Sequence, residues 1–210
     1  MNNEDPKTIL NALGGKRGLL DSGLPALIFL IVFTVTHKLN GSLIAALIVS
    51  AILTIIRLIR KDTLQHALTG LFGVAISAFF ARSTGRAQDF YLPGLIINLV
   101  YGTVYAVANI IGWPVLGLVL GPILGEGAQW RNDPIRKAAY RRAGWIWVAL
   151  FSSRIAVQYP LYRAGAVTEL GIARVIMGWP LFILTGWLTY LILRTVPRTQ
   201  GIDEKVENPL

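Results

Sequence analysis

The chain has 210 residues, of which 54% are hydrophobic and only 15% are charged. Soluble domains usually carry roughly 25% charged residues, so this composition predicts a membrane protein with several spans and leaves no length for a second, soluble domain. The formal net charge is +9, but the basic residues flank apolar runs instead of forming one basic face, which excludes a nucleic-acid partner.

The two ends of the chain are more polar than its centre. Residues 1–20 are expected to form a cytoplasmic segment in which PKTILNALGG predicts a short interfacial helix. No small-residue cleavage site follows the first apolar run, so a cleaved signal peptide is not expected. Residues 196–210 are expected to form a disordered cytoplasmic tail.

Residues 21–195 contain six apolar runs, most of them near the roughly 20 residues that a bilayer crossing needs. Asn40-Gly41, between the first two runs, is a strong turn pair and predicts a tight helical hairpin. The predicted fold class is therefore all-α, a polytopic membrane protein with six transmembrane helices. The runs cover residues 22–38, 42–59, 64–81, 91–111, 143–162 and 171–193.

The distribution of basic residues predicts that both termini are cytoplasmic. With the N-terminus inside, 14 of the 20 Lys and Arg residues lie on the inner side, 5 lie on the outer side, and Arg154 lies within a span. Residues 112–125 are too short for a seventh span, which would also spoil this bias. They predict a re-entrant or interfacial segment, in which Gly117, Gly121 and Gly125 share one helical face for close helix packing or, alternatively, for lining a substrate path.

Two sequence patterns recur. DSGLPALIFLIV (21–32) and DFYLPGLIINLV (89–100) agree at six of twelve positions, and each opens a set of three spans. A true repeat would give a 3+3 inverted arrangement, which is typical of transporters, whereas chance similarity between apolar segments is the alternative. Gly-Trp-Pro also occurs twice, and kinks for packing are the alternative to hinge motion there. The candidate hinge residues are Gly112, Pro114, Gly178 and Pro180.

Polar side chains inside two predicted spans indicate a buried site. Asn98, Tyr101, Tyr105 and Asn109 are spaced three, four and four residues apart, which places them on one helix face. In the fifth span Arg154, Gln158 and Tyr162 are four residues apart. Asn98 and Arg154 would lie at similar depths, roughly 10–12 Å from the outer ends of their spans.

An arginine inside a bilayer costs at least about 2.5–3.5 kcal/mol and therefore needs a partner. No predicted span has an interior Asp or Glu, so the expected hydrogen-bond partners of Arg154 are Asn and Tyr side chains, freed carbonyls or a bound anion. A structural network between the two helices is the alternative to a ligand site. In a ligand site, Arg82, Arg86 and Asp89 would form the outer mouth. The alternative is an interfacial Arg–Asp pair with a turn at Gly85.

Signatures of catalysis and of metal binding are weak. The chain has no cysteine, and His37 and His66 lack metal-ligand spacing. Asp62, four residues before His66, is more simply a helix-start residue. We therefore expect no cofactor, no metal and no catalytic residue.

FFARSTGRAQDFYLPG (79–94), followed by NLVYG (98–102) and Gly-Trp-Pro, resembles an uncharacterised family of actinobacterial multi-pass membrane proteins. More distantly, DSGLP, the tight turn and RLIRK (57–61) resemble the intracellular septation protein A group, from whose pattern Arg82 to Asp89 depart. The resemblance implies a bacterial plasma membrane location and supplies no catalytic residues.

The leading hypothesis is a small transporter or a lipid- or anion-handling protein. The alternative is a non-catalytic cell-envelope or division scaffold that acts through its loops, and an intramembrane lipid enzyme is the third and least supported. The expected partners are membrane lipids and an anionic small molecule or lipid headgroup, and a homo-oligomer is left open.

Overall fold

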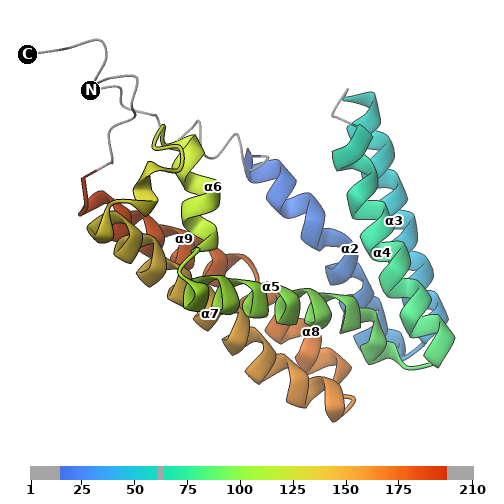
Figure 1. Ribbon diagram of the computed structural model, residues 1–210. Coiled ribbons are helices and arrows are strands. Elements are labelled where there is room, and N and C mark those ends of the chain that lie inside the picture. Colours follow the sequence, from blue (N-terminus) through green and yellow to red (C-terminus); the bar gives the residue numbers. More distant parts are fainter. Residues whose placement is uncertain (1–14, 61–63, 198–210) are drawn as a thin grey trace, which may run out of the picture. The chain divides into compact units, whose positions relative to one another are not determined.

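The computed structural model describes residues 15–60 and 64–197, and this part of the chain is helical without strands (Figure 1). The predicted interfacial helix and nearly all of the predicted tail lie outside the described residues. In chain order the helices are α2 (Gly15–Thr36), α3 (Leu39–Ile59), α4 (Leu64–Thr84), η1 (Ala87–Tyr91), α5 (Leu92–Ile111), α6 (Val115–Ile123), η2 (Gln129–Arg131), α7 (Pro134–Arg163), α8 (Val167–Ile176) and α9 (Trp179–Arg194), of which η1 and η2 are short 3-10 helices.

The chain divides into two compact units that interleave along the sequence. Unit 1 comprises the described residues up to Leu95 together with Gln158–Trp179, and unit 2 comprises Ile96–Val157 and the described residues from Pro180 onward. Two boundaries fall inside the continuous helices α5 and α7, and the third falls between Trp179 and Pro180. Neither unit therefore corresponds to one half of the predicted inverted repeat.

Length and composition identify fewer spans than the six predicted from the sequence. Among the described residues, three helical stretches are long and apolar enough to cross a membrane, and two shorter apolar helices accompany them. The predicted span 143–162 lies in α7, which is 30 residues long but carries several arginines and does not meet this criterion. The three long stretches are Leu39–Ile59, Ala87–Ile111 and Val167–Arg194, and the shorter helices are Gly23–Thr36 and Leu68–Thr84.

Unit 1 contains the predicted hairpin, but the position of its turn was predicted wrongly. The chain reverses at His37 and Lys38, with His37 at φ 50°, and Asn40-Gly41 lie in the first turn of α3. The Thr36 hydroxyl accepts from Lys38 N–H at 3.3 Å, and the Ser42 hydroxyl donates to the Lys38 carbonyl at 2.9 Å. These side chains satisfy the backbone groups beside the reversal, so the helix can begin before Asn40.

The core of unit 1 is aromatic and joins α2 to η1 and α8. Phe29 of α2 is fully buried, stacks on Phe90 with ring centroids 3.9 Å apart and meets Tyr91 edge-on at 5.8 Å. Leu170 of α8 completes this cluster. At Gly171 a Cβ would lie 2.7 Å from the Tyr91 hydroxyl oxygen, so only glycine lets α8 approach this closely.

Both Gly-Trp-Pro tripeptides lie at helix boundaries. Gly112 has φ 82° just after α5, and Pro114 directly precedes α6. The predicted sixth span is broken, because α8 ends at Ile176 and α9 begins at Trp179. Pro180 then sits in the first turn of α9, where its missing N–H costs no helical hydrogen bond. Motion at these hinges stays a prediction.

The segment 112–125 contains a helix of nine residues, α6, which is too short to cross a membrane. Gly117 and Gly121 face the indole of Trp130, where a Cβ at either glycine would lie within 2.8 Å of the ring. The prediction that Gly125 shares this face is wrong. The helix has already ended at Ile123, and Gly125 follows it with φ 74°.

A buried ion pair holds this part of unit 2 together. The Arg136 guanidinium pairs with the Glu126 carboxylate, and both side chains are at most 1% exposed. Tyr140 donates to Glu126 Oε2 at 2.8 Å. Arg136 Nη1 donates to the carbonyls of Leu193 at 2.9 Å and Val196 at 3.1 Å, at the end of α9. The pair therefore joins the turn after α6 to the start of α7 and the end of α9.

Charge and burial also set the protonation of this cluster. Burial raises the pKa of Tyr140 to about 12, and its hydrogen bond to Glu126 acts in the same direction. Burial lowers the pKa of Arg136, but the hydrogen bond to Glu126 and the nearby charges outweigh this and raise it overall. Tyr140 therefore remains a hydrogen-bond donor, and Arg136 remains a cation, at physiological pH.

Arg136→Met is expected to destabilise the protein by about 3 kcal/mol, because it leaves the buried Glu126 carboxylate without its counter-ion. Thermal unfolding of the purified protein measures this. Adding Glu126→Gln should recover part of the loss, and Arg142→Met at an exposed position of α7 is the matched control. Equal unfolding temperatures for Arg136→Met and Arg142→Met would contradict a structural role for the pair.

Candidate functional site

Three connections of unit 1 surround one hollow, which we name the Arg86 hollow. They link α2 to α3, α4 to η1, and α7 to α8, and the hollow has a volume of about 570 Å³. That all three connections lie on the outer side, as the charge distribution predicts, stays a prediction. The lining residues are Phe33, His37, Leu39, Gly85, Arg86, Ala87, Gln88, Gly165, Ala166, Val167, Thr168 and Glu169.

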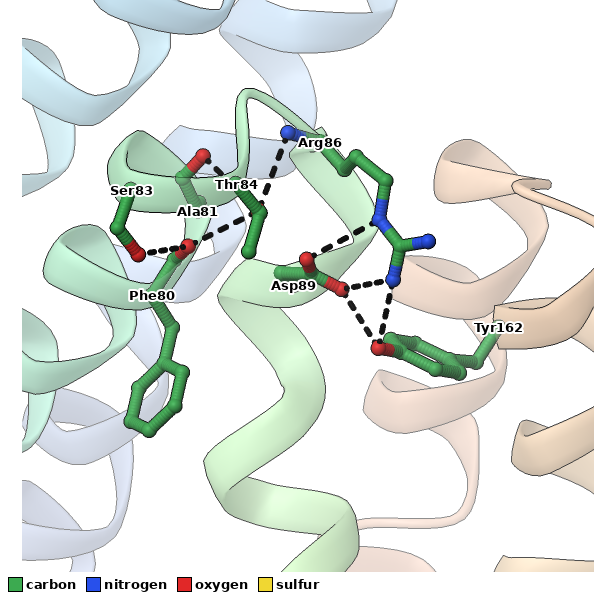
Figure 2. A network of polar contacts seen from close by, with 7 residues as sticks. All are labelled: Phe80, Ala81, Ser83, Thr84, Arg86, Asp89 and Tyr162. Atoms are coloured by element: carbon green, nitrogen blue, oxygen red, sulfur yellow. Dashed lines mark hydrogen bonds and ion pairs between the residues drawn. The ribbon is translucent and has the colours of Figure 1, made fainter.

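Arg86 is held on one side by a carboxylate and a phenol (Figure 2). Its Nε donates to Asp89 Oδ2 at 3.2 Å, and its Nη2 donates to Asp89 Oδ1 at 3.0 Å. The Tyr162 hydroxyl donates to Asp89 Oδ1 at 2.6 Å and accepts from Arg86 Nη2 at 3.1 Å. Tyr162 lies near the end of α7, so this cluster ties α7 to the connection before η1.

Local sequence explains how Arg86 reaches this position. Helix α4 ends at Thr84, and Gly85 follows with φ 70°, a conformation that favours glycine. The Thr84 hydroxyl donates to the Phe80 carbonyl at 3.0 Å and accepts from Arg86 N–H at 3.3 Å. The turn therefore delivers Arg86 directly to Asp89, three residues later.

Burial differs sharply between the two charged groups. The Asp89 side chain is 1% exposed, whereas the Arg86 side chain is 56% exposed. Hydrogen bonding to Asp89 and its negative charge raise the pKa of Arg86, which stays cationic. Its third nitrogen, Nη1, points away from Asp89 and Tyr162 (Figure 2). Arg86 can therefore neutralise the buried carboxylate and still present an oriented donor to a ligand.

The predicted outer mouth is only partly assembled. Arg86 and Asp89 form the ion pair that sequence reasoning treated as the simpler interpretation, with the turn at Gly85. Arg82 is exposed and lines a different hollow, between α3 and α4. The two arginines therefore do not line one hollow.

The polar face of α5 lies against α7 within unit 2, the helix that sequence reasoning paired with it. Tyr105 stacks on Trp147 with ring centroids 5.7 Å apart, and Tyr101 contacts Phe151 at 5.6 Å. Asn109 is buried and donates from Nδ2 to the Arg141 carbonyl at 3.2 Å. These contacts are those of helix packing, and a ligand-lining role for this face stays a prediction.

The predicted polar face of α7 extends over both units. Arg154 is half-buried in unit 2, where half-buried Asn98 of α5 also lies. Gln158 is buried in unit 1, four residues before Tyr162. Tyr162 alone of these residues is part of the Arg86 cluster, so a ligand site at Arg154 stays a prediction.

Sequence reasoning missed several groups near the Arg86 hollow. His37, Gln88 and Glu169 line it. The one sequence signal that could have found Glu169 is its position just before the sixth apolar run. Arg174 donates to the Tyr91 carbonyl at 3.4 Å and lies 5.5 Å from the centre of its ring. Within the described residues no group of three His, Asp or Glu side chains is placed to hold a metal ion.

Tyr162→Phe is expected to lower the stability of unit 1 by about 1–2 kcal/mol, because the buried Asp89 carboxylate loses a charge-assisted hydrogen bond. The unfolding temperature of the purified variant measures this effect. Tyr159→Phe, at an exposed position of the same helix, is the control. A Tyr162→Phe protein that unfolds with this control would show that the hydrogen bond contributes nothing to stability.

A family described as "Protein of unknown function (DUF3159)" matches residues 13–200, which include every described helix. Neither a curated protein nor a solved structure matches the chain. Nothing links the chain to the septation protein A group, so the more distant resemblance is without support. The match extends from the first described helix to beyond the last, and the chain therefore belongs to the DUF3159 family.

Proposed function

We propose that this protein is a six-span protein of the bacterial plasma membrane, with both termini cytoplasmic, that binds a ligand with an anionic group at the Arg86 hollow. The observation that carries the ligand proposal is the half-exposed Arg86 guanidinium, oriented by Asp89 and Tyr162 at the edge of a hollow. The ligand is a solute or the headgroup of a lipid.

The grouping of the connections supports the six-span topology. In unit 1, the three connections that the charge distribution assigns to the outer side gather around the Arg86 hollow. In unit 2, Arg136 joins the start of α7 to the end of α9, and both are assigned to the inner side. Antiparallel neighbours joined by short connections bring every second connection to the same end of a bundle, which is the grouping that six alternating spans require. The inverted repeat has no comparable support, because the units do not follow its halves.

The lining of the hollow narrows the class of ligand. Asp89 already neutralises Arg86, and Glu169 adds a further acid to the lining. An anion that has no positive group of its own would meet this negative charge without a second cation to balance it. A ligand that also carries an ammonium fits better, with its anionic group at Arg86 and its ammonium group at Glu169.

Transport is the stronger form of the proposal and depends on Arg154, which lies inside a predicted span. An arginine at that depth is a default candidate for a ligand pathway. Arg154→Ala should then abolish flux of the ligand into vesicles and leave binding at Arg86 intact.

A scaffold that binds envelope or division proteins through its loops is the second candidate. Arg131, Arg141 and Arg142 are exposed, and the Arg131 guanidinium lies 3.6 Å from the centre of the Trp113 ring. They present a cationic surface on the predicted cytoplasmic side. Neutralising these arginines should disrupt a scaffold without changing ligand binding at Arg86.

The topology predicts which introduced cysteines an impermeant maleimide can reach in intact cells. The chain has no cysteine, so each introduced thiol is the only one. Lys38→Cys and Arg163→Cys, both at exposed outer positions, should react in intact cells, and Arg142→Cys should react only after lysis. Labelling of Arg142→Cys in intact cells would contradict the proposed orientation.

The ligand proposal predicts that the purified protein binds phosphoethanolamine more tightly than inorganic phosphate in calorimetric titrations. Arg86→Lys should weaken both roughly tenfold, because one ammonium cannot hold Asp89 and the ligand with the geometry of a guanidinium. Glu169→Gln should weaken phosphoethanolamine binding alone. Arg163→Gln, an exposed cation outside the lining, is the control. Unchanged binding in Arg86→Lys, or no binding by the wild type, would leave the scaffold as the better candidate.

A further inference from the structure

We propose that the groove between α3 and α4 binds a phospholipid, with the phosphate at Arg82 and an acyl chain along its apolar walls. This site is separate from the Arg86 hollow and does not depend on the function proposed there. We name it the Arg82 groove, and its volume is about 380 Å³.

The groove is built from two matching helix faces. Its α3 residues and its α4 residues are both spaced three, one and three apart, so each set forms one stripe along its helix. Ala75 and Ala78 have small side chains, so the α4 wall leaves space beside the larger side chains of α3. The stripes are Asn40, Leu43, Ile44 and Leu47 on α3, and Ala75, Ala78, Phe79 and Arg82 on α4.

The polar groups lie at one end of the groove. Asn40 is near the start of α3 and Arg82 is near the end of α4, and these two helices form an antiparallel pair in unit 1 (Figure 1). Every other lining residue is apolar. The groove therefore has an apolar length that ends in a cation and an amide, which is the distribution of chemistry along a phospholipid.

Arg82 is available to a ligand in a way that Arg86 is not. The Arg82 side chain is exposed, and among the described residues no hydrogen bond or ion pair engages it. None of the described residues that line the groove is acidic. A phosphate would supply the missing negative charge, and the Asn40 amide could donate a second hydrogen bond to it.

The dimensions favour a lipid over a free anion. From Arg82 to Ala75 the α4 stripe covers seven residues, or about 10 Å of helix. This is roughly two thirds of one leaflet's hydrocarbon depth. A soluble phosphate would use only the Arg82 end and leave the apolar walls uncovered. Arg82 belongs to the predicted outer end of its helix, so the lipid would come from the outer leaflet.

Native mass spectrometry of the full-length protein, with phosphatidylglycerol added to the detergent, tests the proposal. The wild type should retain one phosphatidylglycerol molecule. Arg82→Gln should lower its occupancy roughly tenfold through loss of the charge-assisted contact. Ala75→Leu should lower it similarly by filling the groove, with an unchanged unfolding temperature. Arg163→Gln removes the same charge from another exposed outer position and should retain the lipid.

The outcomes separate the proposal from its competitors. Equal occupancy in wild type, Arg82→Gln and Ala75→Leu overturns it. Loss in Arg82→Gln together with full occupancy in Ala75→Leu also overturns it, because the phosphate would then bind a surface cation without a chain in the groove. Displacement of phosphatidylglycerol by glycerol phosphate would overturn it for the same reason.

Ala75→Val, with its smaller side chain, replaces Ala75→Leu should that variant not fold. Arg86→Lys should not change lipid occupancy, so failure here is distinguishable from failure at the Arg86 hollow.

Discussion

Both compact units depend on one arrangement, a buried carboxylate that is shared by an arginine and a tyrosine hydroxyl. In unit 1 the carboxylate is Asp89, and Arg86 and Tyr162 hold it. In unit 2 the carboxylate is Glu126, which Arg136 and a second tyrosine hold. Burying an unpaired charge is prohibitively costly, so each carboxylate obliges distant segments to meet around it. The two clusters thus determine which connections and helix ends lie together within each unit.

Arg86 and Arg136 differ in whether a hydrogen-bond donor of the guanidinium remains available to a ligand. Arg136 is buried, and its Nη1 donates to the carbonyls of Leu193 and Val196, so its role is structural. Arg86 is mostly exposed and borders a hollow, so its pairing with Asp89 leaves one guanidinium nitrogen available to donate to a ligand. A functional role is therefore better argued for Arg86. Arg82 extends the contrast, since its guanidinium has no partner among the described residues and ends an apolar groove.

The sequence patterns of the predicted intramembrane faces predicted helix packing better than they predicted chemistry. The spacing of Tyr105 and Asn109 identified one face of α5, and both side chains contact α7. The same reasoning grouped Tyr162 with Arg154 because both lie on one face of α7. Tyr162 instead binds Asp89, which lies on the 3-10 turn before α5. Helical spacing specifies which side chains share a face, but it does not specify what that face meets.

The resemblance of FFARSTGRAQDFYLPG (79–94) pointed to an uncharacterised family, and the chain belongs to one. Composition, hydrophobic period and a turn signal were sufficient to predict helices throughout the described residues, several of them membrane-like, and a hairpin between the first two of them. These features depend on local sequence, because helix formation and hydropathy are properties of short windows. Only the tertiary structure decided that the hairpin reverses at His37, that Trp130 fills the glycine face of α6, and that Glu126 pairs with Arg136. Such contacts join segments through close packing and charge pairing, and neither leaves a periodic signal along the chain.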